Sequence, residues 1–167
     1  DDLWGFLEAN PEAPDSDSKG QEEAQTYFLG SLVLIKEKDK PEATVVDGQQ
    51  RLTTLTLLFA ALRASVSPEI SSAIGEYIYE KGNPVSKLPD RFRLQLRPLD
   101  NPFFKEFVQR EEGFGKLVEL DSFDSRLDTD AKRNLRANAI VFREKLEGLS
   151  EDQRKDLAIC IANRCYL

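Results

Sequence analysis

The sequence has no histidine, and among its 167 residues it has two cysteines and one tryptophan. The absence of histidine excludes Ser-His-Asp and Cys-His catalysis, histidine-containing zinc sites and histidine-dependent nuclease motifs. The cysteines, Cys160 and Cys165, are too few for a zinc site and are expected to be reduced, buried thiols of a cytosolic protein. Catalysis by this chain must therefore use carboxylates, amides, hydroxyls, arginine or lysine, and a bound metal is expected to assist.

Long apolar runs and an excess of basic charge are also missing. No run approaches the roughly 20 apolar residues that span a membrane, and the N-terminus lacks the features of a secretory signal. The 23 basic and 30 acidic residues give a net charge of −7, which argues against a surface built mainly to wrap nucleic acid. We expect a cytoplasmic protein without a membrane partner. Because it starts at Asp1 and ends where a strand begins, at residues 165–167, we expect a piece of a longer chain.

The front of the chain predicts a small sheet followed by a central helix. Residues 27–36 form a continuous apolar run with β-branched members, which predicts a buried strand whose Gly30-Ser31 step leaves room for close backbone approach. A charged turn joins it to a second strand at 43–46, so the two should form an antiparallel hairpin. Residues 49–64 are apolar almost all round, which predicts a buried central helix.

The remainder of the chain is expected to be mostly helical. Phe92, Leu94 and Leu96 alternate with polar residues, which predicts a half-exposed strand whose basic face carries Arg91, Arg93 and Arg97. The other expected elements are a helix tail at 1–9, a solvated loop at 10–25, helices at 68–78 and 101–108, an irregular segment at 111–125, and helices at 128–146 and 150–163.

The junction Asp47-Gly48-Gln49-Gln50-Arg51, between the second strand and the central helix, is the main candidate site. Asp47 and Gln50 have the spacing of a capping box, which on its own would be worth about 1 kcal/mol. A capping box does not explain Gln49, nor Arg51, whose positive charge opposes the helix dipole by up to about 1 kcal/mol. A phosphate held by the free N–H groups and the arginine would explain both. The residues alone leave both interpretations open.

Two strings carry a family resemblance: YFLGSLVL at residues 27–34 and VVDGQQRLTTL at residues 45–55. They closely resemble the DGQQR-motif domain, first catalogued as a domain of unknown function. That domain forms the N-terminal part of GmrSD-type modification-dependent restriction enzymes and related phage-defence proteins. The resemblance covers most of the chain, including Arg91 to Leu94 and the region from about Asp128. The family resembles the ParB/sulfiredoxin fold, in which a strand–Gly–helix turn with a downstream arginine binds a nucleotide.

The resemblance implies roles for the residues of the turn. Gly48 would let the backbone approach the phosphates, Arg51 would pair with them, and Gln49 and Gln50 would bind phosphate or orient the attacking water. Asp47 would either bind Mg²⁺, which takes a few carboxylates plus phosphate oxygens, or cap the helix. The implied catalytic residues are Asp47, Gln49, Gln50 and Arg51; the implied nucleotide-binding residues are Gly48, Arg51, Thr53 and Thr54; the implied metal ligand is Asp47.

The resemblance also predicts the domain organisation and the function. We expect an α+β fold, with a ParB/sulfiredoxin-like nucleotide-binding unit at 1–100 and a helical extension at 101–167. Members usually carry an upstream segment with a Tyr-Gln-Arg motif, absent here, so the full-length protein rather than this stretch is expected to hydrolyse a nucleoside triphosphate. Hydrolysis would control a DNA nuclease, often of the His-Asn-His type, in a C-terminal or separate domain.

Two other functions remain open on the sequence. The chain could be a non-catalytic sensor or interaction module that keeps the turn only as a scaffold. It could instead read modified DNA with Arg91, Arg93 and Arg97, although such an exposed face is more often solvated or paired with carboxylates. A further basic cluster on the 128–146 helix is interpreted as a solvated face; it comprises Lys132, Arg133, Arg136 and Arg143.

Overall fold

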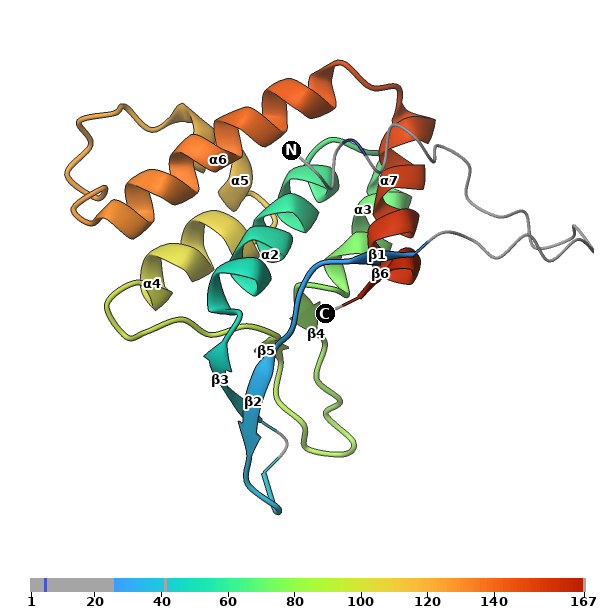
Figure 1. Cartoon of the computed structure of the whole chain (residues 1–167), viewed down its shortest axis with the longest axis vertical. Helices are drawn as coiled ribbons and strands as arrows, with labels where there is room; N and C mark the ends of the chain where they lie inside the picture. Colours follow the sequence, from blue (N-terminus) through green and yellow to red (C-terminus); the bar gives the residue numbers. More distant parts are fainter. Residues whose placement is uncertain (1–4, 6–25, 41, 167) are drawn as a thin grey trace, which may run out of the picture.

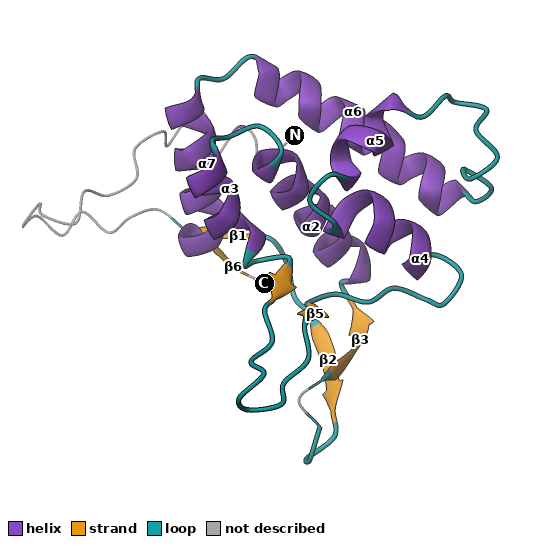
Figure 2. Ribbon diagram, turned by 180° about the vertical axis from the view of Figure 1, so that it is seen from behind, coloured by secondary structure: helices purple, strands orange, loops and turns teal. Residues whose placement is uncertain are grey.

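The computed structural model of the chain describes Gly5 and residues 26–40 and 42–166. Within these residues the protein is α+β, as expected: the helices form the body, and short strands lie at its edge (Figure 2). The helices are α2 (Gln49–Arg63), α3 (Pro68–Gly75), α4 (Asn101–Phe104), the π-helix η1 (Lys105–Gln109), α5 (Gly113–Glu119), α6 (Asp130–Glu147) and α7 (Glu151–Arg164). The strands are β1 (Tyr27–Phe28), β2 (Val33–Lys36), β3 (Ala43–Asp47), β4 (Tyr79–Glu80), β5 (Arg91–Phe92) and β6 (Cys165–Tyr166).

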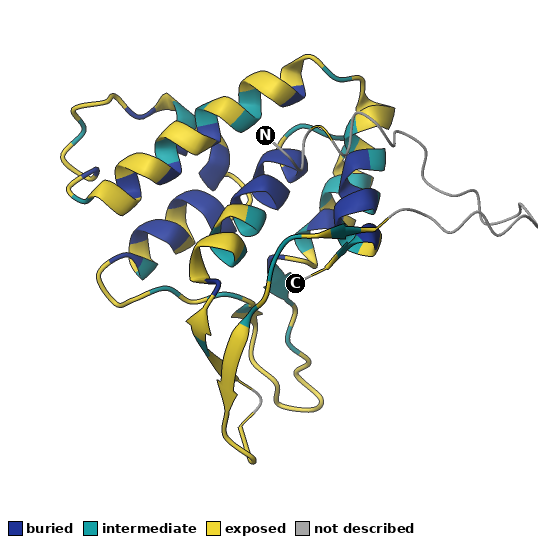
Figure 3. Ribbon diagram, in the orientation of Figure 1, coloured by how far each residue is buried: buried dark blue, intermediate teal, exposed yellow. Residues whose placement is uncertain are grey.

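The apolar run at 27–36 forms two strands, so the prediction of one buried strand was wrong. Gly30 divides it, because its φ of 117° is a left-handed conformation that turns the chain out of the strand direction. β1 pairs in parallel with β6, near the other end of the chain, which confirms the strand expected there. β2 pairs with β3 in the expected antiparallel hairpin, but all four of its residues are exposed. The hairpin projects from the helical body and is exposed along most of its length (Figures 1 and 3).

Helix α2 is the central helix, as predicted, but the prediction that it is buried along its whole length was wrong. Its second half, from Leu57 to Arg63, is buried and packs against α3, α6, α7 and η1. Its first half extends out of the core toward the hairpin and is exposed or half-buried (Figures 1 and 3). One apolar cluster contains Leu57 and Leu62 as well as Phe104, Leu117 and Leu146, so the core continues across residue 100. The division of the chain into units at residue 100 stays a prediction.

The later elements differ from the expected ones in two places. Exposed and half-buried residues alternate along 91–97, as predicted, but only Arg91–Phe92 is a strand, and it pairs with β4. Residues 111–125 contain α5, which was expected to be irregular; it is short and includes two glycines, so its packing against η1 and α6 stabilises it more than its helix propensity does.

The expected helices α3, α6 and α7 are present. Thr129 caps α6, and Ser150 and Gln153 form a capping box that starts α7. The helix tail expected at 1–9 and the loop at 10–25 lie outside the described residues, apart from helical Gly5. Among the described residues, no helix is long and apolar enough to span a membrane.

Candidate functional site

The strand–Gly–helix turn has the backbone geometry that its sequence predicts. β3 ends at Asp47, Gly48 adopts φ 91° and ψ 8°, and α2 begins at Gln49. Gly48 is buried beside the β1–β2 loop (Leu29–Leu32), and a Cβ atom there would collide with Leu32 Cδ2. Both the left-handed conformation and the lack of space therefore require glycine at this position.

The N-terminus of α2 has no side-chain cap, so the predicted capping box was wrong. The N-cap residue is Gly48, one position later than the Asp47 that the box requires, and no side-chain hydrogen bond caps the helix. The first bond of the helix runs from Leu52 N to Gly48 O at 3.1 Å, so the N–H groups of Gln49, Gln50 and Arg51 precede it. The first turn also holds no acidic residue. The free N–H groups of Gln49, Gln50 and Arg51 are therefore oriented to donate to an anion.

Arg51 is held beside this helix start by the β1–β2 loop. Its Nη1 donates to the carbonyl oxygen of Ser31 at 2.7 Å. Gly30 lies against the guanidinium: a Cβ atom built on Gly30 would be 2.8 Å from Arg51 Nε and 2.9 Å from Cζ. A backbone carbonyl thus partly offsets the cost of a cation at a helix N-terminus, and the exposed guanidinium keeps further donors.

The other residues of the turn divide into two groups. Gln49 Nε2 donates to Val45 O and Thr53 Oγ1 donates to Gln49 O, each at 2.8 Å, so these two side chains bond to nearby backbone. Asp47, Gln50 and Thr54 are exposed. Asp47, Gln50 and Arg51 are thus exposed polar residues at the N-terminus of α2. Their roles in nucleotide chemistry stay predictions.

The metal expected at Asp47 has few protein ligands available. Within the described part of the chain, no three His, Cys, Asp or Glu side chains cluster in a way that could hold a metal ion. Asp47 contributes one exposed carboxylate. Mg²⁺ needs few protein ligands when substrate phosphates and water complete its octahedron. Asp47 therefore fits Mg²⁺ that arrives together with a nucleotide and does not fit a metal held by protein alone.

The basic face at 91–97 is paired with protein acceptors. Arg91 Nε bonds to Glu80 Oε2 at 2.7 Å, Arg93 Nε donates to the Glu76 carbonyl at 2.6 Å, and Arg97 Nη2 lies 2.9 Å from Asp100 Oδ2. The hydrogen bond from Arg91 lowers the pKa of the Glu80 carboxyl. These contacts agree with the paired interpretation, and DNA recognition by this face stays a prediction.

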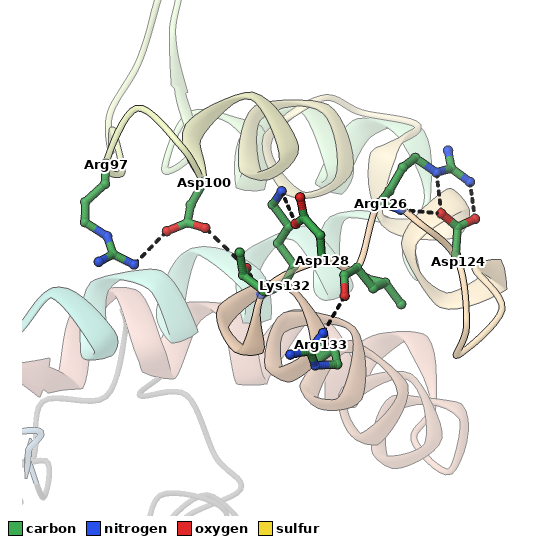
Figure 4. Close-up of polar contacts among 9 residues, drawn as sticks. Arg97, Asp100, Asp124, Arg126, Asp128, Lys132 and Arg133 are labelled. Atoms are coloured by element: carbon green, nitrogen blue, oxygen red, sulfur yellow. Dashed lines mark hydrogen bonds and ion pairs between the residues drawn. The ribbon is translucent and has the colours of Figure 1, made fainter.

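The basic cluster on α6 is only partly the solvated face that its sequence predicted. Lys132 is buried, and its Nζ lies 2.6 Å from Asp128 Oδ1. Arg133 donates to Leu127 O at 2.7 Å and Arg136 donates to Leu120 O at 2.7 Å, so both bind the segment that precedes α6. Figure 4 shows Arg133 and the pair of Lys132 with Asp128. These side chains attach the α5–α6 connection to the body of the domain.

A buried arginine that the sequence interpretation missed lies at the end of α2. Arg63 donates to the carbonyl oxygens of Gln109 at 3.0 Å, Val108 at 3.2 Å and Arg110 at 2.7 Å, where η1 ends. Burial lowers the pKa of its guanidinium, and the nearby Glu111 opposes this shift. Its one sequence signal is a charge in the final turn of an otherwise apolar helix.

Arg63 also lines a cavity. This cavity has a volume of about 920 Å³ and lies between α3, β4 and η1, and its lining does not include the DGQQR turn. Five basic and five acidic side chains line it. This balanced charge selects neither an anion nor a cation, so the cavity does not indicate a ligand class.

The cysteines are free thiols, as expected. Cys160 is buried and Cys165 is half-buried. Burial raises the pKa of both thiols, that of Cys165 to about 11, so both are protonated at neutral pH and neither is an activated nucleophile.

Comparison with known proteins identifies the family. The family model described as "GmrSD restriction endonuclease, N-terminal domain" matches residues 2–167, which include the turn and the helical body. Neither a curated protein nor a solved structure matches the chain, so the likeness to the ParB/sulfiredoxin fold stays an expectation. Because the match covers almost the whole chain, the protein belongs to the family of GmrSD restriction endonuclease N-terminal domains and is part of a restriction system.

Proposed function

We propose that the DGQQR turn binds the phosphates of a nucleoside triphosphate, and that its hydrolysis by the full-length protein controls a DNA nuclease. The observation that carries the proposal is the N-terminus of α2: it has no side-chain cap and no acid in its first turn, and Arg51 is held beside it. An uncapped helix start with an arginine suits a multiply charged anion.

The backbone and Arg51 would share the phosphate groups. The N–H groups of Gln49, Gln50 and Arg51 precede the first helical hydrogen bond, and the left-handed Gly48 starts the helix directly after β3. The Arg51 guanidinium has five N–H donors, and one nitrogen, Nη1, donates to Ser31 O. The remaining donors can pair with phosphate oxygens in the forked geometry that arginine favours.

Asp47 fits this site if Mg²⁺ binds with the nucleotide. A bare carboxylate at this position would repel a triphosphate, whereas Mg²⁺ neutralises phosphate charge and accepts a carboxylate ligand. Asp47 would hold the ion directly or through water. Because Asp47 does not cap α2, its carboxylate is not committed to the helix N-terminus.

The glutamines differ in their suitability for handling the attacking water. Gln49 and Gln50 are both exposed in the first turn of α2, but Gln49 Nε2 already donates to Val45 O. We therefore propose Gln50 as the residue that orients the water and Gln49 as a support of the turn. Thr53 and Thr54, one turn further along α2, would line the site.

The nuclease that this hydrolysis would control lies outside the chain. The family is that of an N-terminal domain of a restriction endonuclease, and the 167 residues contain no histidine for a His-Asn-His centre. DNA and a nuclease domain or subunit are therefore the proposed partners of the full-length protein.

The proposal is tested by titrating full-length protein with ATP, GTP, CTP and UTP, each with Mg²⁺. Wild type should bind at least one nucleotide, and Arg51→Ala should weaken that binding at least tenfold, because loss of a charge-assisted hydrogen bond costs about 1.5–3 kcal/mol. The matched control is Arg91→Ala, an exposed arginine paired with Glu80 away from the turn. Equal affinity of wild type and Arg51→Ala would contradict the proposal, and binding without phosphate release would instead indicate a sensor.

A further inference from the structure

We propose that Gly30 and Ser31 are positioning residues for Arg51, and that the β1–β2 loop thereby couples the phosphate site to strand β6. The proposal extends the proposed function, because it names the residues that hold Arg51 and the element that would respond to the nucleotide. It rests on contacts at both ends of the four-residue loop Leu29–Leu32.

At one end, the loop contacts the Arg51 guanidinium. The Ser31 carbonyl accepts the Nη1 hydrogen bond at 2.7 Å, and the bare Cα of Gly30 lets the guanidinium lie against the backbone. Any other residue at position 30 would be unfavourable for two reasons. Its Cβ would be 2.8 Å from Arg51 Nε, and a φ of 117° is strained for a residue with a Cβ. Gly30 thus sets the position of Arg51.

At the other end, the same loop is bonded to the last strand. Leu29 N donates to Tyr166 O at 2.8 Å, and this bond continues the parallel pairing of Tyr27 with Cys165 and of Phe28 with Tyr166. The bond to β6 and the bond to Arg51 are therefore two residues apart in the chain. Figure 1 shows β1 beside β6 and the chain then passing alongside α2 to reach the hairpin.

Strand β6 is suited to respond to small changes in this loop. It is two residues long, and β1 is its partner in a two-stranded sheet among the described residues. So short a pair has little stability of its own.

A phosphate at Arg51 would stiffen this connection. Because the guanidinium has several donors, it can keep its bond to Ser31 while other N–H groups bind phosphate. Fixing the guanidinium from both sides restricts the loop, which in turn stabilises the Leu29–Tyr166 hydrogen bond. Nucleotide binding would thus make the backbone hydrogen bonds between β1 and β6 open less often.

The first test measures hydrogen exchange of full-length protein without nucleotide. Arg51→Ala should speed exchange at Leu29 and at the β6 amides, with no change in α6, whereas Arg91→Ala should leave all of these unchanged. Unchanged exchange at Leu29 and β6 in Arg51→Ala would overturn the coupling. This test is independent of the proposed function, because no nucleotide is present.

The second test is a double-mutant cycle on nucleotide affinity, using Gly30→Ala and Arg51→Ala. We expect each single change to weaken binding about tenfold, or about 1.4 kcal/mol. Arg51→Ala removes the side chain that the methyl group of Gly30→Ala would displace, so the double variant should bind as well as Arg51→Ala alone. If the double variant instead loses affinity by the product of the two single losses, Gly30 acts independently of Arg51 and the positioning role is overturned. Gly115→Ala, where an added Cβ meets nothing within 4 Å, is the matched control.

The outcomes separate the two proposals. If wild type binds none of the four nucleotides with Mg²⁺, the proposed function fails, and the nucleotide-free exchange experiment still decides whether Arg51 holds the loop and β6. If nucleotide binds through Arg51 but leaves exchange at Leu29 and β6 unchanged, the proposed function stands and the coupling is overturned. If Gly30→Ala does not fold, the exchange experiments on Arg51→Ala and on wild type with nucleotide decide the inference.

Discussion

Arg51 Nη1 donates to the carbonyl oxygen of Ser31 across 2.7 Å, joining two residues that are 20 positions apart in the chain. This bond attaches the first turn of α2 to the loop between β1 and β2. It also explains how a cation is tolerated at a helix N-terminus, where the dipole disfavours it. The central consequence is that Arg51 is in place beside free N–H groups before any ligand binds.

Asp47 should contribute little to the stability of the fold. Since Gly48 is the N-cap and no side chain caps α2, Asp47→Ala should change the free energy of unfolding by less than about 0.5 kcal/mol. Urea denaturation measures this change. Ser150→Ala is the positive control: it removes the capping box of α7 and should cost about 1 kcal/mol. An equal loss in Asp47→Ala would mean that Asp47 caps α2 after all.

Gly48→Ala should destabilise the protein. The substitution forces a β-carbon into a left-handed conformation and against Leu32 Cδ2, and the strain alone should cost about 1–2 kcal/mol. Gly115→Ala supplies the contrast, because its site in α5 is open and alanine favours helix by about 0.5–1 kcal/mol. The two variants should therefore shift the thermal midpoint in opposite directions. A neutral Gly48→Ala would show that the turn relaxes freely.

Arg63 should be structural. Arg63→Ala removes a donor from the carbonyl groups of Val108, Gln109 and Arg110 and should destabilise the fold by about 2–4 kcal/mol. The Arg110 carbonyl keeps the Gly113 N–H as a donor at 3.0 Å. The surface control Arg91→Ala should cost no more than about 1 kcal/mol. Both values come from denaturant titration. Comparable small losses in the two variants would show that water replaces the Arg63 guanidinium at the end of η1.

Acid should weaken the α5–α6 connection through Asp124. The Arg126 side chain and its backbone N–H donate to this carboxylate and lower its pKa from 3.8 to about 2 (Figure 4). A depressed pKa means that the stabilisation is complete above the unfolded-state value and is lost as pH falls toward 2. The stability difference between wild type and Asp124→Asn should therefore shrink between about pH 4 and pH 2 and stay constant above pH 5. A difference independent of pH would contradict the assignment.

Much of the fold follows from local patterns in the sequence. The apolar residues of 49–64 predict the central helix, and Ser150 with its following polar residues predicts the start of α7. The strand–Gly–helix turn also follows, because Gly48 ends a β-branched run directly before a helical pattern. Each of these features depends on neighbours within a few residues, which is the range over which sequence patterns carry information.

The features that could not be predicted depend on distant partners. The break at Gly30 is stabilised by Arg51 and by β6, neither of which is near it in sequence. Helix α5 has weak intrinsic propensity and forms through packing on η1 and α6. The capping-box interpretation placed the N-cap one position too early, at Asp47 instead of Gly48. Helix boundaries are the least certain part of a sequence-based assignment.

Phosphate release by full-length Arg51→Ala tests the central claim most directly. The assay compares wild type, Arg51→Ala and Arg91→Ala with each of the four nucleoside triphosphates and Mg²⁺, with folding of every variant checked by its thermal midpoint. We predict that Arg91→Ala keeps the wild-type rate of phosphate release and that Arg51→Ala lowers this rate at least about 100-fold. Such a loss is typical when a charge that binds phosphate in the transition state is removed. Wild-type turnover by a folded Arg51→Ala protein would contradict the assignment of the DGQQR turn as the nucleotide site.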